Sequence, residues 1–284
     1  MERHLLLAIG KHPKTTSGLN FVSNFFTRKD EIRFTLLTIS STTPEIASDP
    51  LELAFAERKG LAFLKKAQGT LEANGFSNEN IALRNIQAKG TRALSLMHEA
   101  TEGKFDAVVL SHRERMGIDD LLDSSVCREI LKGSKVSHPP PIWLCRQLAQ
   151  GRKGVLLCSD GSEPSIRMAD HVGFMLQEVP EQKVRVLHIA DPAKTDLSHT
   201  EFIVQQTVDE LVAAGLEEDR ISYKILRGRK TARMILEETA QGNYAVVAMG
   251  TTGADRNLMS KLFTGSVARS VFLELNGAVL WASF

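Results

Sequence analysis

Short apolar runs alternate with longer amphipathic segments along the whole chain. Runs such as residues 5–10 and 155–160 follow a basic residue and are apolar on consecutive positions, which is typical of strands buried on both faces of a sheet. Between the runs, apolar residues recur at the helical period. The pattern predicts helices at residues 51–74, 91–102 and 122–132 in the first half, and at 164–177, 199–214, 231–241 and 264–275 in the second.

The two halves of the chain show the same succession of elements, at an offset of roughly 140 residues. Five matches occur in the same order: 5–10 with 155–160, 34–39 with 184–189, 103–110 with 242–249, 124–128 with 265–269, and 141–145 with 278–282. Strand and helix alternate in each half, so the sequence predicts two α/β domains in which parallel strands are joined by right-handed crossovers and helices cover both faces of the sheet. The polar stretch 147–153 separates them, giving domains at residues 1–146 and 154–284.

Composition excludes several classes of function. The 35 basic and 34 acidic residues leave a formal charge of +1, so no broad electrostatic attraction to nucleic acid or to an anionic membrane is expected. The apolar run near the N-terminus is too short for a secretory signal or a spanning helix, and we expect a cytoplasmic protein. Cys127, Cys145 and Cys158 lack the spacing of a disulfide framework or a zinc site and are interpreted as small buried residues. The eight histidines show no metal-binding spacing either, so we expect no catalytic metal.

In open parallel sheets, ligands bind beyond the carboxyl ends of the strands, and the second half places polar residues there. The first such segment, 159–165, ends a strand at an Asp160-Gly161 turn and begins a helix at Pro164, so Asp160 is directed at the crevice. Alternatively, Asp160 or Ser162 only caps the helix. The end of the second strand offers the backbone of Ile189 to a base edge, while His188 is interpreted as a half-buried packing residue.

A glycine-rich segment forms the third part of this candidate site. It comprises Gly250 and Gly253, followed by Gly265, Ser266 and Val267 at the start of a helix. Glycines let the backbone approach an anion closely, and the amides at a helix N-terminus carry partial positive charge. The same residues also serve as a helix stop, a turn and an N-cap, and that alternative stays open. The chain has neither a P-loop nor a Gly-x-Gly-x-x-Gly motif, which argues against P-loop NTPases and dinucleotide dehydrogenases.

These residues resemble the universal stress protein family over essentially the whole chain. Nucleotide-binding members carry Gly-x2-Gly-x9-Gly-[Ser/Thr], and the resemblance implies two tandem open sheets of five parallel strands, related to the adenine-nucleotide hydrolase and Rossmann-like folds. It also implies ATP, with or without Mg²⁺, held in the second half. The implied contacts are the backbone of Gly250, Gly253, Gly265, Ser266 and Val267 for the phosphates, and Asp160 and Ile189 for the nucleoside.

The sequence departs from the family pattern in both halves. In the second, the gap after Gly253 is eleven residues long, and Thr251 stands where a basic residue is usual; Lys261 or Arg256 could supply that charge, or could be solvated loop residues. In the first, Gly10 replaces the aspartate, and the glycine positions are assigned to His112, Arg115 and Ser124. Side chains there would obstruct phosphate, so the first half is interpreted as a degenerate, empty copy. Alternatively, His112, Arg113 and Arg115 form a different anion site.

Two of three candidate functions are compatible with these features. The first is a stress-response module that binds ATP in its second half and is not an enzyme beyond slow ATP hydrolysis, because no general base lies beside a nucleophile. The second is a nucleotide-free interaction scaffold for an unidentified protein partner. The third, a hydrolase of the related adenine-nucleotide folds, predicts a Ser-Gly-Gly-x-Asp-Ser loop after the first strand, which this chain lacks.

The closing strands of the two halves, 142–145 and 279–282, are apolar and contain Trp143 and Trp281. Exposed apolar edges invite pairing, so we expect the halves to form an internal pseudo-dimer through these strands, with a homodimer of two chains as a further arrangement. Alternatively, each strand only completes its own sheet and the tryptophans pack on local helices.

Overall fold

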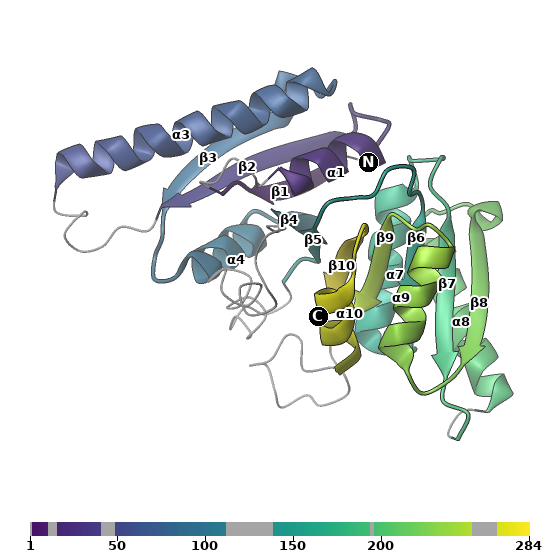
Figure 1. Ribbon diagram of the computed structural model, residues 1–284. Coiled ribbons are helices and arrows are strands. Elements are labelled where there is room, and N and C mark those ends of the chain that lie inside the picture. The colour runs from purple at the N-terminus through teal and green to yellow at the C-terminus, as the bar shows by residue number, and fades with distance from the viewer. Residues whose placement is uncertain (1, 11–15, 41–48, 112–138, 194–195, 252–265) are drawn as a thin grey trace. The chain divides into compact units, whose positions relative to one another are not determined.

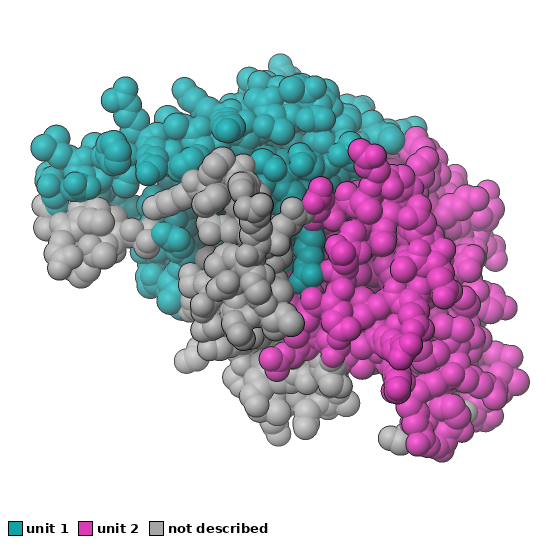
Figure 2. Space-filling model, viewed as in Figure 1, with its two compact units in different colours: residues 1–146 teal, residues 147–284 magenta. Residues whose placement is uncertain are grey.

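The computed structural model describes residues 2–10, 16–40, 49–111, 139–193, 196–251 and 266–284. The chain divides into two compact units, Met1–Arg146 and Gln147–Phe284 (Figure 2).

The first unit contains five parallel strands in the order β3-β2-β1-β4-β5 (Figure 1). The strands are β1 (Arg3–Ala8), β2 (Ile32–Ser40), β3 (Ile81–Gln87), β4 (Ala107–Ser111) and β5 (Ile142–Cys145). The described helices are α1 (Ser17–Phe25), α3 (Pro50–Ala73), the 3₁₀ turn η1 (Asn78–Asn80) and α4 (Arg92–Glu102). On β3, Arg84 reaches Glu99 of α4 while Asn85 donates to the carbonyl of Glu57 in α3, so α3 and α4 cover opposite faces.

The second unit repeats this order as β10-β9-β6-β7-β8, again with parallel neighbours. Its strands are β6 (Val155–Cys158), β7 (Val184–Ala190), β8 (Ile221–Arg227), β9 (Val246–Gly250) and β10 (Val279–Ser283). Its helices are α7 (Glu163–Leu176), α8 (Leu197–Ala213), η2 (Glu218–Arg220), α9 (Thr231–Gln241) and α10 (Ser266–Glu274). Helices α7 and α8 pack together, as do α9 and α10. The α/β class and the parallel sheet expected from the sequence are confirmed.

Several side-chain contacts recur at matched positions of the two units. Thr38 of β2 donates its hydroxyl to the carbonyl of Ile9, and His188 of β7 binds the carbonyl of Ser159. An ion pair joins the third strand to the next helix in both, Arg84 with Glu99 and Lys224 with Glu238. The turn before the fourth strand has a residue of positive φ in each, Lys104 (49°) and Asn243 (55°). The repeat read from apolar runs therefore extends to individual contacts.

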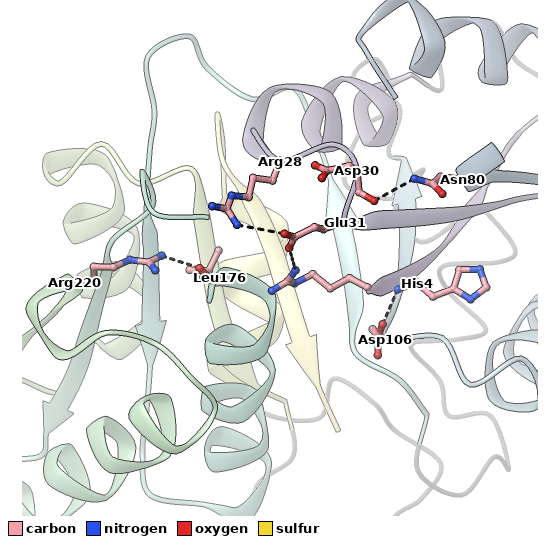
Figure 3. Close-up of polar contacts among 9 residues, drawn as sticks. His4, Arg28, Asp30, Glu31, Asn80, Asp106, Leu176 and Arg220 are labelled. Atoms are coloured by element: carbon pink, nitrogen blue, oxygen red, sulfur yellow. Dashed lines mark hydrogen bonds and ion pairs between the residues drawn. The ribbon is translucent and has the colours of Figure 1, made fainter. Parts of the chain in front are cut away.

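The edges at which the strands begin differ more between the units (Figure 3). In the first unit, the N–H of His4 donates to Asp106, the side chain of Asn80 donates to the carbonyl of Asp30, and Glu31 pairs with Arg3 and Arg28. In the second, one buried guanidinium, that of Arg220, binds the carbonyls of Leu176, Val179 and Gln182. This single residue ties the end of α7 to the start of β8.

Both tryptophans are fully buried against helices of their own unit. Trp143 stacks on Phe26 and meets Phe21 of α1 edge-on, while Trp281 contacts the ring of His171 in α7. This is the local packing that the sequence analysis gave as an alternative for these side chains. The pseudo-dimer itself stays a prediction.

Burial of His171 has a consequence for stability against acid. Desolvation lowers the pKa of His171 to about 3, so the ring stays neutral in the fold while an unfolded chain protonates it below about pH 6.5. Since the folded pKa is depressed, the stability contributed by the neutral ring is lost as pH falls below 6.5, at about 1.4 kcal/mol per pH unit. We expect wild type to lose about 2 kcal/mol more than His171→Phe between pH 7 and pH 5, measured by urea unfolding. Equal losses in the two proteins would contradict this assignment.

Candidate functional site

The candidate site lies where the chain leaves adjacent strands of the second unit toward opposite faces of the sheet. Strand β6 lies between β7 and β9; the chain leaves β6 for α7, which packs with α8, and leaves β9 for α10, which packs with α9. Crossovers that diverge in this way open a crevice at the carboxyl ends of the strands. Asp160 follows β6, and Gly250 ends β9, so two of the three predicted segments flank this point.

Asp160 is exposed, and its carboxylate organises the turn before α7. Its Oδ1 accepts hydrogen bonds from the N–H of Ser162 at 3.0 Å and from the Ser162 hydroxyl at 2.5 Å. Gly161 between them has a φ of +76°, which favours glycine. Ser162 is the N-cap residue of α7, but its side chain makes no capping hydrogen bond. The alternative of a structural role for Asp160 therefore holds in part, and the carboxylate remains accessible.

The backbone of Ile189 is directed toward the space above β6. The Ser159 N–H donates to the carbonyl of Leu187 at 3.0 Å, and Gly228 donates to that of Ala190, so odd-numbered residues of β7 face β6 and even-numbered ones face β8. The last ladder pair of β6 and β7 joins Cys158 and Leu187. The N–H and C=O of Ile189 thus lie beyond the end of β6, where a base edge could meet them.

Gly250 has a packing role that the sequence did not reveal. A Cβ at this position would lie 2.7 Å from the Ser165 nitrogen and 2.8 Å from the Pro164 carbonyl carbon, so the start of α7 rests directly on the end of β9. The neighbouring Thr251 is buried, and both its N–H and its hydroxyl donate to the carbonyl of Ser283. Thr251 therefore joins β9 to β10.

The remaining glycine-segment residues are only partly within the described chain. Helix α10 begins at Ser266, within two residues of the expected start, and Val267 is half-buried in its first turn. Gly253, Gly265, Lys261 and Arg256 lie outside the described residues, as does the Ser266 side chain. The predicted helix at 122–132 lies outside them too.

The first unit differs at the corresponding positions. Strand registers match Ala8 with Leu110 and Cys158 with Met249, so Ser111, rather than His112, is the counterpart of Gly250. The glycine that permits the close approach is here on the helix: Gly18 of α1 donates its N–H to the Ser111 hydroxyl at 2.9 Å. The other residues assigned to this loop, His112, Arg113, Arg115 and Ser124, are outside the described part of the chain.

A buried hydroxyl cluster beneath the Asp160 turn escaped the sequence analysis. Ser159, Ser165 and Thr207 are each at most 5% exposed, and the Thr207 and Ser159 oxygens are 2.7 Å apart. His188, expected to be half-buried, is 5% exposed and has a specific partner, since its Nδ1 lies 2.9 Å from the Ser159 carbonyl. Ser159 and Ser165 belong to the predicted 159–165 segment, but no feature of the sequence links them to Thr207 in α8.

The described residues offer little for other chemistry. Among them, no group of three or more His, Cys, Asp or Glu side chains could hold a metal ion. Cys145 and Cys158 are buried, and burial raises the pKa of both thiols, which keeps them protonated as the sequence analysis expected for buried residues. No helix in the described ranges is long and apolar enough to cross a membrane.

Most of the second unit matches a known protein family. Residues 151–281 match the model of the Universal stress protein family. The fold is similar to a universal stress protein from Archaeoglobus fulgidus DSM 4304, with 14% identity, 99% of this chain and 97% of that chain covered, and a TM-score of 0.72. A protein of Pseudomonas aeruginosa UCBPP-PA14, assigned to the universal stress proteins, shows 12% identity, coverage of 99% and 93%, and a TM-score of 0.58.

The remaining comparisons give a weaker match or none. A universal stress protein in complex with cAMP matches 46% of this chain and 96% of its own at 19% identity, with a TM-score of 0.38, and a match of that quality says nothing about the ligand of this chain. No curated protein matches the chain significantly.

Proposed function

Because residues 151–281 of this chain are a domain of the universal stress protein family, we propose that the protein is a cytoplasmic tandem universal stress protein that binds ATP in its second unit and acts as a stress-response module. The observation that supports the proposal is that β9, β6 and β7 are neighbours in the sheet, with Gly250 and Ile189 at the carboxyl ends of β9 and β7 and Asp160 following β6. An exposed carboxylate suits ribose hydroxyls, and the amide and carbonyl groups at a strand end suit a base edge. The start of α10 is suited to phosphate, since helix N-termini attract anions.

The first unit is proposed to be a degenerate copy, with domain limits of 1–146 and 154–284. Its strand order and its Thr38 and Arg84 contacts support a common fold. Gly10 supplies no carboxylate, and Ser111 replaces the first glycine. On this basis one chain binds one ATP. The internal pseudo-dimer, a homodimer and an unidentified protein partner belong to the same proposal, as does the expectation of at most slow ATP hydrolysis.

We expect Gly265→Val to abolish measurable ATP binding, because a branched side chain would occupy the phosphate position, and Asp160→Ala to weaken it about tenfold or more, as for loss of a hydrogen bond to a charged group. Isothermal titration with ATP, with and without Mg²⁺, measures both effects and the stoichiometry. Asp219→Ala is the matched control, because it removes an exposed carboxylate from η2, at the start of β8. Unchanged affinity in Gly265→Val, or two ATP per chain, would contradict the assignment.

A nucleotide-free scaffold is the second candidate, and Thr251 favours it. This residue follows the first glycine, yet its hydroxyl is committed to Ser283 and it brings no positive charge toward a phosphate. Mass spectrometry of small molecules released from purified protein separates the candidates. No released adenine nucleotide, together with no thermal shift on adding ATP, would favour the scaffold.

A further inference from the structure

We infer that Thr207 of α8 is a positioning residue which, through Ser159, holds Asp160 in place at the site proposed above. The inference rests on the proposed function only for its ligand; the positioning itself is a property of the free protein. Thr207 is fully buried and lies 48 positions from Ser159 in the sequence. Both residues are buried, so they would act on a ligand through the exposed residue that follows Ser159.

The Thr207 hydroxyl links helix α8 to Ser159. It donates to the Ser159 hydroxyl oxygen at 2.7 Å and also lies 2.8 Å from the carbonyl oxygen of Ile203 in the same helix. Ser165 likewise donates to the carbonyl of Ser162 at 2.8 Å. The Ser159 oxygen in turn accepts the N–H of Gly161 at 3.4 Å. The Ser159 oxygen thus accepts from both the turn and α8, and hydrogen bonds connect the turn to Thr207.

The backbone of Ser159 is fixed from the other side by β7. Its N–H donates to Leu187 at 3.0 Å, and its carbonyl lies 2.9 Å from His188 Nδ1, which must be the protonated nitrogen because a carbonyl only accepts. Ser159 is thus held by β7 through its main chain and by α8 through its side chain. The adjoining Asp160 extends from an anchored residue while its own carboxylate closes the turn on Ser162.

The first unit shows that the fold does not require these hydroxyls. The helix ends of α3 and α8 match at Gly75 and Gly215, which places Ala67 at the position of Thr207, and the strand registers place Ile9 at the position of Ser159. The contact of His188 persists there as Thr38. The first unit, which lacks the aspartate, has apolar residues at the positions of Ser159 and Thr207. The second unit, which carries Asp160, has hydroxyls at both of these positions. Burying a hydroxyl costs free energy, and the first unit folds with apolar residues at these two positions. The hydroxyls of Ser159 and Thr207 therefore point to a role in placing the Asp160 turn.

The test compares Thr207→Val, which keeps the branched shape and removes the hydroxyl, with Thr207→Ser, which keeps the hydroxyl. In the ligand-free full chain, NMR hydrogen exchange of the Gly161 and Ser162 amides reports the turn, and titration with ATP reports the site. We expect Thr207→Val to speed exchange of both amides about tenfold and to weaken ATP about tenfold, and Thr207→Ser to restore both. Ser159→Ala should match Thr207→Val, and it serves if the valine variant does not fold. Ala67→Ser is the control and should leave both readouts unchanged.

The outcomes distinguish the positioning role of Thr207 from the proposed binding of ATP. If Thr207→Val leaves exchange and ATP affinity unchanged, or if Thr207→Ser behaves like the valine variant, the positioning role is wrong. If wild type binds no ATP, the proposed function fails, while the amide exchange rates still decide whether Thr207 orders the turn.

Discussion

Replacing Arg220 by methionine is expected to lower the free energy of unfolding of the second unit by at least about 3 kcal/mol. The guanidinium is 5% exposed and donates to the carbonyls of Leu176, Val179 and Gln182 at 2.7 to 3.1 Å. Figure 3 shows the contact with Leu176. Methionine keeps the apolar stem and removes every donor. Each of the three carbonyls loses a hydrogen bond from a charged donor, which contributes about 1.5–3 kcal/mol. The carbonyls of Leu176 and Val179 keep a backbone partner, the N–H of Val179 and of Gln182 respectively. Urea unfolding followed by far-UV circular dichroism measures the loss.

The first unit supplies a matched control for this prediction. Asn80 ends η1 as Arg220 ends η2, but its side chain makes one exposed hydrogen bond, to the carbonyl of Asp30 at 3.2 Å. Asn80→Ala should therefore cost less than about 1 kcal/mol. Arg220→Lys should fall between the two, since one ammonium cannot reach all three carbonyls in the same geometry. A cost for Arg220→Met no greater than that for Asn80→Ala would show that water replaces the guanidinium.

Burial explains which strands the sequence could predict. Central strands such as β1, β6 and β9 are buried on both faces, so each is a continuous apolar run and was located directly. The edge strands β3 and β8 were not located by residue, because Ile81–Gln87 and Ile221–Arg227 are mostly half-exposed and mix charged with apolar side chains. Helix α1 was also missed. Its sequence, SGLNFVSNF, is rich in Gly, Ser and Asn, which are typical of loops. It is helical because Phe21 packs on Trp143 and Phe25 stacks on Phe21.

The sequence could predict those parts of the candidate site that depend on where strands end. Asp160 and Ile189 follow from where β6 and β7 stop, and the start of α10 from its glycine and serine. The hydroxyl cluster was not predictable, because Thr207 approaches Ser159 only once α8 has packed over β7. His112 was assigned to the place of Ser111 because counting along a loop cannot reveal strand register.

Gly250→Ala is expected to destabilise the second unit by about 3 kcal/mol, at the upper end of the usual cost of overpacking. The added Cβ would lie 2.7 Å from the Ser165 nitrogen and 2.8 Å from the Pro164 carbonyl carbon, and backbone atoms cannot rotate aside as a flexible side chain would. Helix α7 would have to move off β9. Thermal and urea unfolding measure the cost. The matched control is Ser111→Ala in the first unit, where a Cβ is already accommodated and only the bond from the Gly18 N–H is lost, at about 1 kcal/mol.

Unfolding and ATP binding of Gly250→Ala together distinguish a packing role from a ligand-binding role for this glycine. Gly250→Ala should lose stability and ATP binding together, because displacing α7 moves the Asp160 turn that precedes it. Gly265→Val is expected to lose ATP binding at the phosphate position itself. For Gly250, the decisive measurement is unfolding of Gly250→Ala without nucleotide. A Gly250→Ala protein as stable as wild type that still fails to bind ATP would assign Gly250 to the phosphate rather than to α7.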